Sequence, residues 1–223
     1  STVESAVLAI KNAKMPVVVI AAGANRKWVR GELHKFLELT GIPFITSQMG
    51  KGVEDESSRL YLGTTALTSH DFMHHAILSA DLIIMIGHDI TEKPPVLAKN
   101  SQKIIHINFY PADMDDVYRP DIEVIGDIAQ ALRAISEQLD DLPKWDFRHY
   151  FAIKKNMIED INSNVDDPRF PIHPKRFVYE LRESLPRDAF LSLDNGMYKI
   201  WVARNYPAYE QNSVLLDNAL ATT

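Results

Sequence analysis

The sequence contains no cysteine, which removes disulfide frameworks, cysteine-ligated zinc, iron–sulfur clusters and thiol nucleophiles from its chemistry. No apolar run approaches the roughly 18 residues of a membrane-spanning helix, and no signal-peptide pattern opens the chain. A basic excess is also missing, because 24 lysines and arginines stand against 30 aspartates and glutamates. We therefore expect no nucleic-acid partner and no membrane association, and the cytoplasm is the expected compartment.

The composition is that of a folded protein. Hydrophobic residues make up 46% and charged residues 24% of the chain, which are ordinary values for a globular domain. A chain of 223 residues can bury a core without a structural metal and corresponds to about 1.5 domains. It begins at Ser1 and ends at Thr223 without a tail, and both observations favour a piece of a longer protein.

Residues 1–139 alternate between helical patterns and short apolar runs. The runs are too short for helices and rich in β-branched residues, which is typical of strands buried on both faces of a parallel sheet. We expect strands at 15–20, 42–46, 82–86, 103–107 and 122–125. We expect helices at 3–10, 29–39, 69–80 and 128–135, with Gly41 ending the second. This order predicts an α/β fold with a doubly wound parallel sheet, whose ligands lie outside the carboxyl ends of the strands.

The composition changes after residue 139. Prolines and acidic pairs mark residues 140–175 as a linker that carries one helix near 150–161. From residue 176 the pattern predicts a helix, a strand, a sharp turn, a second helix and a strand that starts at 214. These few elements are not enough to cover a parallel sheet on both faces. Residues 176–223 are therefore predicted to be an incomplete second α/β domain.

Two groups of residues are candidates for phosphate binding. Gly23, Gly63, Gly87 and Gly126 lie next to apolar strands, where they either let the backbone approach a phosphate or simply end strands. The turn Asp194-Asn195-Gly196 precedes a helix, so it either receives a diphosphate or is an Asx turn that caps that helix. Glycine-rich nucleotide motifs and hydrolase motifs are absent from the sequence, and we assign no catalytic residue and no metal ligand.

The order and spacing of several stretches resemble the thiamine-diphosphate-dependent acetolactate synthase (acetohydroxyacid synthase large subunit) family. These stretches are residues 15–23, 41–44, the sequence Met49-Gly50-Lys51-Gly52, and residues 80–87, 105–108, 126–128 and 194–201. The resemblance covers nearly the whole chain. It implies that residues 1–139 are the family's central domain, similar to a deoxyhypusine-synthase-like nucleotide fold, and that residues 176–223 begin its diphosphate-binding domain.

The resemblance also implies an activity. A complete enzyme of this kind decarboxylates pyruvate and transfers the two-carbon unit to a second 2-oxo acid, with thiamine diphosphate and Mg²⁺ as cofactors. Its substrates are small 2-oxo acids, and it assembles as a homodimer or tetramer. The family's catalytic glutamate would precede this sequence and its Mg²⁺-binding segment would follow Thr223, so we expect the chain alone to be inactive.

The same resemblance assigns cofactor-binding residues. It places Asn195, Gly196, Met197 and Tyr198 at the diphosphate end of the thiamine cofactor. It places six residues along the family's nucleotide cleft, used or vestigial, namely Gly23, Gly63, Thr64, Gly87, Asn108 and Asp127.

Departures from the family pattern argue against FAD. Ala21-Ala22-Gly23 stands where flavin-binding members have three glycines, and His88-Asp89 stands where they have an arginine. Losing a cation and gaining an aspartate disfavours a bound diphosphate, so the chain is more similar to the flavin-independent, catabolic type. Two other readings stay open, namely another thiamine-diphosphate 2-oxo-acid decarboxylase or oxidase, and a non-catalytic nucleotide-binding or oligomerisation module.

Overall fold

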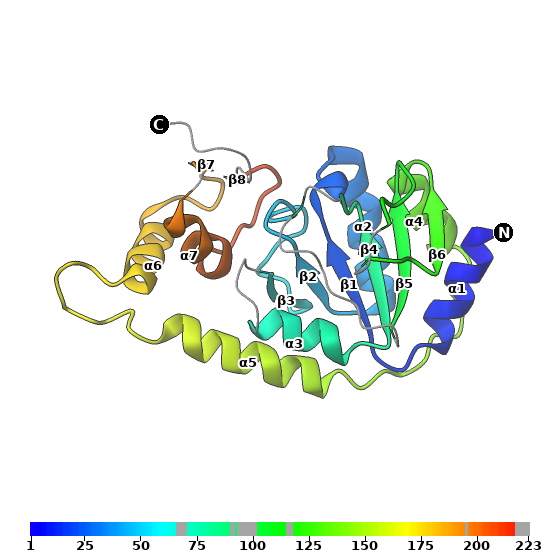
Figure 1. The fold of residues 1–223 in the computed structure, drawn as a ribbon, viewed down its shortest axis with the longest axis horizontal. Coiled ribbons are helices and arrows are strands. Elements are labelled where there is room, and N and C mark those ends of the chain that lie inside the picture. Colours follow the sequence, from blue (N-terminus) through cyan, green and yellow to red (C-terminus); the bar gives the residue numbers. More distant parts are fainter. Residues whose placement is uncertain (66–70, 90–91, 93–101, 115–117, 195, 217–223) are drawn as a thin grey trace.

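A six-stranded parallel sheet forms the centre of the larger unit. The computed structural model describes residues 1–65, 71–89, 92, 102–114, 118–194 and 196–216 (Figure 1). The strands follow the order β3-β2-β1-β4-β5-β6, and every neighbouring pair is parallel. They are β1 (Pro16–Ile20), β2 (Phe44–Thr46), β3 (Tyr61–Thr64), β4 (Leu82–Ile86), β5 (Lys103–Asn108) and β6 (Ile122–Ile125). The order reverses between β1 and β4, which makes their carboxyl ends the expected ligand position.

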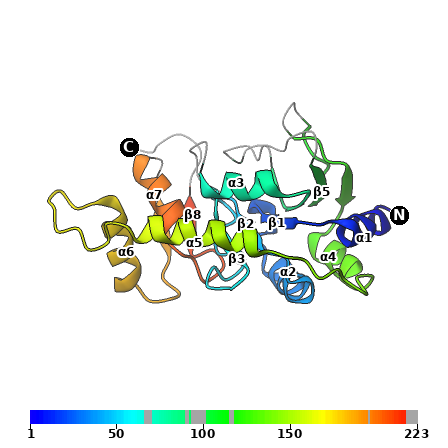
Figure 2. The same cartoon turned by 90° about the horizontal axis from the view of Figure 1, so that it is seen from below.

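Helices cover both faces of this sheet, as Figure 2 shows for α3 on one side and α2 and α4 on the other. They are α1 (Thr2–Asn12), α2 (Lys27–Thr40), α3 (Phe72–Ser79), α4 (Ile128–Ser136) and α5 (Arg148–Asn162). Core residues of α1, α2 and α4 cluster against one face, and those of α3 and α5 against the other. The predicted doubly wound α/β fold is confirmed.

The central strands are buried on both faces. In β1, Val18 and Ile20 pack toward α2, whereas Val17 and Val19 pack toward α3, and all four are 0% exposed. A strand with two covered faces needs apolar residues at every position, which explains the uninterrupted run in the sequence. Gly41 ends α2 as predicted, in the left-handed conformation, with its N–H bonded to the carbonyl of Leu37.

Strand β3 is the one sheet strand that the sequence pattern did not predict. It is four residues long, and Gly63 interrupts its apolar run. Gly63 has a φ of +157°, and a Cβ atom there would lie 2.6 Å from Sδ of Met157 and 2.8 Å from Sδ of Met73. The glycine therefore lets α3 and α5 pack closely on the sheet edge. Because glycine has a weak strand propensity, the sequence pattern does not predict β3.

A smaller unit follows α5. It contains α6 (Pro174–Ser184), β7 (Leu191–Leu193), α7 (Met197–Asn205) and β8 (Val214–Leu216), and β7 and β8 pair in parallel. Its own apolar core includes Val178, Val202 and Tyr206. Helix α5 runs along the edge of the sheet and leads to α6 (Figure 1). In the part of the chain that the structure describes, no helix combines the length and apolarity needed to cross a bilayer.

A buried ion pair in the loop between β2 and β3 lies where the two units meet. Nζ of Lys51 lies 2.8 Å from Oε2 of Glu56, and their side chains are 1% and 0% exposed. Lys51 also donates a 3.2 Å hydrogen bond to Oγ1 of Thr64 in β3. The Glu56 carboxylate accepts from the N–H of Ala208 at 2.8 Å, while the N–H of Glu56 donates to the carbonyl of Ala208 at 3.1 Å. The loop between β2 and β3 therefore holds the chain segment after α7.

Gly52, in the Met-Gly-Lys-Gly stretch, allows this close contact. Its φ is +73°, and a Cβ atom would lie 2.5 Å from the carbonyl oxygen of Glu210. A side chain at this position would therefore push residues 208–210 away from the loop.

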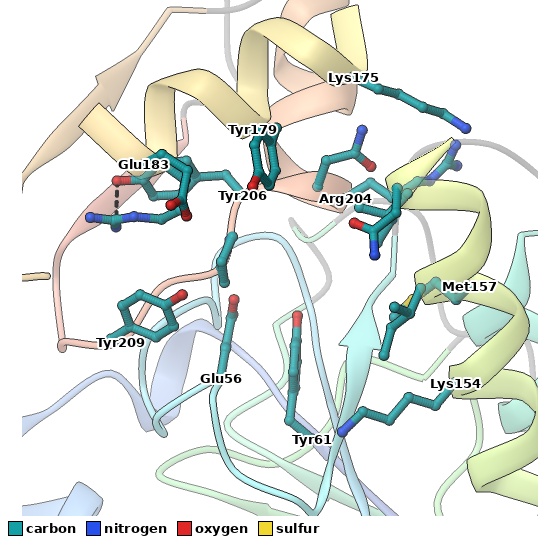
Figure 3. A pocket seen from close by; sticks show the side chains of 16 residues that line it. Glu56, Tyr61, Lys154, Met157, Lys175, Tyr179, Glu183, Arg204, Tyr206 and Tyr209 are labelled. Carbon is teal, nitrogen blue, oxygen red and sulfur yellow. Dashed lines mark hydrogen bonds between the residues drawn. The ribbon is translucent and has the colours of Figure 1, made fainter. Parts of the chain in front are cut away.

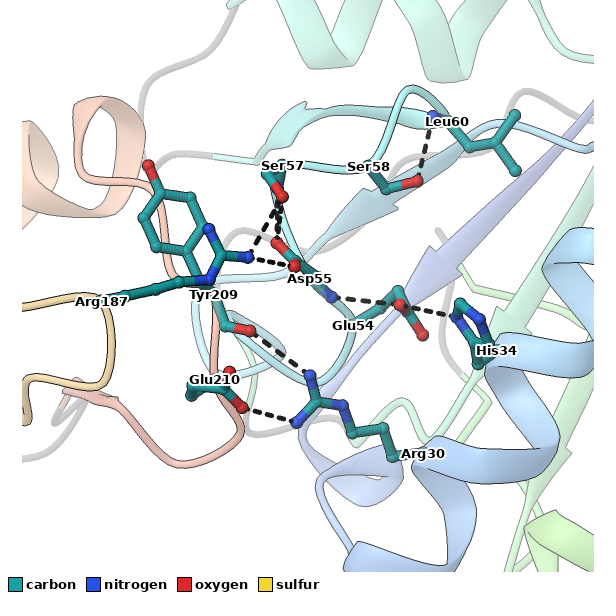
Figure 4. Close-up of polar contacts among 10 residues, drawn as sticks. All are labelled: Arg30, His34, Glu54, Asp55, Ser57, Ser58, Leu60, Arg187, Tyr209 and Glu210. Carbon is teal, nitrogen blue, oxygen red and sulfur yellow. Dashed lines mark hydrogen bonds and ion pairs between the residues drawn. The ribbon is translucent and has the colours of Figure 1, made fainter.

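Charged side chains surround the joint (Figure 4). Arg30 of α2 pairs with Glu210 at 3.1 Å and donates to the Tyr209 carbonyl at 3.4 Å. On the other side, Arg187 pairs with Asp55 and stacks 4.2 Å from the centre of the Tyr209 ring. Tyr209 is thus contacted by arginines of both units.

The Gly63→Ala substitution is expected to lower the free energy of unfolding by about 1–3 kcal/mol, because the new methyl group meets both methionines in a strained backbone. Gly31→Ala is the matched control, since nothing lies within 4 Å of a Cβ atom there. It should raise helix stability by about 0.5–1 kcal/mol. Urea denaturation measures both changes, and equal stability of Gly63→Ala and wild type would contradict the packing argument.

Lys51→Met is expected to cost about 3–5 kcal/mol, because it leaves the Glu56 carboxylate buried without its cation. The double variant Lys51→Met/Glu56→Gln should recover much of this loss. Lys35→Met is the control, since Lys35 pairs with Glu32 at 2.9 Å but its side chain is 70% exposed. The control should cost less than about 1 kcal/mol in the same denaturation experiment. Similar losses in the two single variants would show that the buried pair is not specially important.

Candidate functional site

Three of the predicted cleft residues meet at the switch point of the sheet. Gly23 follows β1 and donates its N–H to the carbonyl of Gly87, which follows β4, at 2.8 Å. A Cβ atom on Gly23 would lie 2.7 Å from that carbonyl oxygen and 3.1 Å from Oδ1 of Asn108 at the end of β5. Asn108 in turn donates to the carbonyl of His88 at 2.8 Å. Because Gly23 and Gly87 have no side chains, the backbone after β1 packs directly against the backbone after β4.

A carboxylate of the chain itself lies at this switch point. Glu92 is 3% exposed and accepts a 2.9 Å hydrogen bond from the N–H of Ala22, the first residue of the 3₁₀ turn η1 (Ala22–Ala24). Its other oxygen accepts from the hydroxyl of Ser47, which follows β2. The position after β1 where an α/β sheet commonly binds a phosphate thus holds a carboxyl group.

The surroundings of Glu92 favour its neutral form. Burial raises its pKa to about 7, although the hydrogen bonds from Ser47 and Ala22 act in the opposite direction. Gln48 follows Ser47 in the loop after β2, and neither polar atom of its buried amide has a hydrogen-bond partner among the described residues. Sequence reasoning did not single out Glu92 or Gln48, because neither belongs to a spacing that identifies a site.

The other predicted cleft residues lie elsewhere. Gly63 packs against two methionines, and Thr64 is 1% exposed beside Lys51, with its hydroxyl 2.8 Å from that of Thr46. Asp127 caps α4 by accepting from the N–H of Gln130 at 2.9 Å. A binding role for these three residues stays a prediction, and their present contacts are structural.

The second predicted group lies at the start of α7. Asn195 lies outside the described residues, and Gly196 is the N-cap residue of the helix. Met197 and Tyr198 are 76% and 46% exposed, and a Cβ atom on Gly196 would lie 2.5 Å from the Tyr198 ring. The ring therefore folds back over the glycine.

The charge at the start of α7 suits an anion. The first turn carries no acidic residue, and Lys199 within it is 2% exposed. Free backbone N–H groups at a helix N-terminus add a partial positive charge. A cofactor-binding role for Gly196 and the first turn of α7 stays a prediction; a bound thiamine cofactor would supply the carbanion chemistry.

Glu92→Gln is expected to remove a pH dependence of stability. Below pH 4.5 the carboxyl group is protonated in both states, whereas between pH 4.5 and about 7 the unfolded chain loses the proton that the folded protein keeps. Relative to Glu92→Gln, wild type should therefore lose about 2–3 kcal/mol of stability as the pH rises through this window.

Chemical denaturation at several pH values measures this difference. Glu38→Gln, at an exposed position of α2, is the control and should show only a small change. A wild type that gains stability relative to Glu92→Gln over the same window would contradict the raised pKa.

Comparison with known proteins agrees with this geometry. A family model described as thiamine pyrophosphate enzyme, central domain, matches residues 3–135. The acetolactate synthase of Bacillus subtilis (strain 168) is 27% identical over 232 residues, which cover 99% of this chain and 40% of that protein. The catabolic acetolactate synthase of Raoultella terrigena is 25% identical over 227 residues, with the same coverage of 99% and 40%.

A probable acetolactate synthase large subunit of Methanococcus aeolicus is 28% identical over 239 residues, which cover 99% of this chain and 40% of that protein. The chain thus spans about 40% of the length of the relatives described. Because the family model covers more than half of the chain, the chain belongs to the thiamine pyrophosphate enzymes, whose central domain it contains.

Proposed function

We propose that this chain is part of a thiamine-diphosphate-dependent acetolactate synthase, which decarboxylates pyruvate and transfers the two-carbon unit to a second 2-oxo acid. The observation that carries the proposal is similarity over 99% of the chain to acetolactate synthases from separate organisms. In this proposal residues 1–139 are the central domain, residues 140–175 the linker and residues 176–223 the start of the diphosphate-binding domain.

In this proposal the chain binds one end of the cofactor. The N–H groups at the start of α7 hold its diphosphate. The diphosphate is oriented by Asn195, Gly196, Met197 and Tyr198. We assign no Mg²⁺ ligand and no catalytic residue here, and we propose that the glutamate and the metal-binding segment belong to other parts of a longer protein, which acts as a homodimer or tetramer.

We also propose that the cleft beside Gly23 and Gly87 does not hold a flavin diphosphate. The carboxyl group of Glu92 already accepts from the N–H of Ala22, and in its ionised form it would repel a phosphate. These contacts support the flavin-independent, catabolic type of enzyme.

An acetolactate assay tests the proposed reaction. A longer protein that contains this chain should form acetolactate from pyruvate when thiamine diphosphate and Mg²⁺ are added, whereas the 223-residue chain alone should not. Release of CO₂ without acetolactate would overturn the proposal in favour of a decarboxylase. Saturable binding of FAD or an adenine nucleotide to the chain, without turnover by the longer protein, would favour a nucleotide-binding module.

A further inference from the structure

A cavity of about 290 Å³ lies where the two units meet (Figure 3). Helix α5 forms one wall with Lys154 and Met157, α6 contributes Tyr179, and the end of α7 contributes Arg204. The labelled side chains of Glu56 and Tyr61 close it on the side of the sheet. The proposed reaction makes no use of this space.

The wall of the cavity includes a buried amide without a partner. Asn205 is 9% exposed, and neither Nδ2 nor Oδ1 forms a hydrogen bond with any described residue. A buried amide without hydrogen-bond partners lowers the stability of the fold. Asn205 offers one donor group and one acceptor to whatever enters the cavity.

Two cations in the wall have no carboxylate partner among the described residues. Lys154 donates only to the carbonyl of Arg59, at 3.3 Å, and burial lowers the pKa of its ammonium group. Arg182 is 9% exposed, and it donates to the hydroxyl of Tyr206 at 2.7 Å and to the carbonyl of Leu185 at 2.8 Å. Its charge is therefore solvated by neutral groups.

The remaining charges in the wall are largely balanced. Lys175 pairs with Asp160 at 2.9 Å, and Arg204 lies 3.4 Å from Asp71. The Glu56 carboxylate is neutralised by Lys51, and Glu183 is an exposed acid at the rim. The wall thus carries a net positive charge, which favours an anionic occupant.

We propose that this cavity binds a small organic carboxylate, with its carboxylate against Lys154 and a hydroxyl or second polar group against Asn205. Water alone would satisfy the amide but would not balance the charge of Lys154 and Arg182. The volume lies at the low end of ligand pockets, so the occupant is a small metabolite and not a nucleotide. Met157, Ile158 and Ile161 provide the apolar side for its carbon chain.

Calorimetric titration of the 223-residue chain with L-malate tests the proposal, because malate carries two carboxylates and a hydroxyl group. We expect saturable binding at low salt, no binding of the neutral analogue malamide, and at least about tenfold weaker binding by Lys154→Met. Lys155→Met is the matched control, since this neighbouring lysine has a 77% exposed side chain and pairs with Glu159 along the helix. It should bind malate like wild type.

Asn205→Leu separates a binding role from a structural one. The apolar substitution removes the unpartnered amide, so its Tm should equal or exceed that of wild type while its malate affinity falls. Three results would overturn the proposal: no saturable binding to wild type, equal weakening by Lys154→Met and Lys155→Met, or unchanged affinity in a folded Asn205→Leu variant. Each is independent of whether the longer protein makes acetolactate.

Discussion

The structure depends on one buried ion pair, between Lys51 and Glu56. Two charges without solvent contact are tolerated only where hydrogen bonds satisfy the remaining polar atoms. Thr64 supplies one of these bonds from β3, and Ala208 supplies another from the segment after α7. The pair therefore ties the edge of the sheet to the smaller unit, and Gly52 gives the backbone room for this contact. The cavity lined by Lys154 and Asn205 exists because this joint holds α5, α6 and the end of α7 around a common space.

At the switch point of the sheet, the glycines alone suggest a place where the backbone approaches a phosphate. The structure shows a different use of this close approach. Gly23 and Gly87 permit close approach, but the group that approaches each glycine is the other strand end. The group that accepts from the N–H of Ala22, the second residue after β1, is Glu92. A doubly wound sheet can thus keep its topology while one of its own side chains occupies the position after β1 where such sheets commonly bind a phosphate.

The predictable part of the fold comes from strong local patterns. Strands β1 and β4 are uninterrupted apolar runs, and α2 ends at a glycine whose left-handed backbone is a local property. Strand β3 was not predicted because Gly63 has no side chain to continue an apolar pattern. The reason for a glycine at this position is its packing against Met73 and Met157, which is a tertiary contact. Of the predicted cleft residues, Gly23, Gly87 and Asn108 meet, since each lies at the carboxyl end of one of three neighbouring parallel strands. Gly63 and Thr64 lie two strands farther along the sheet from β1.

The sequence by itself determined the fold class and the family, because periodicity and ordered short motifs are local in the chain. Only the tertiary structure decided which polar groups face one another. Glu92 reaches Ala22 across 70 residues, and Glu56 reaches Ala208 across 152. Lys154 and Asn205 line one cavity only because the two units dock. Burial and charge balance are properties of such distant contacts, and no spacing along the chain encodes them.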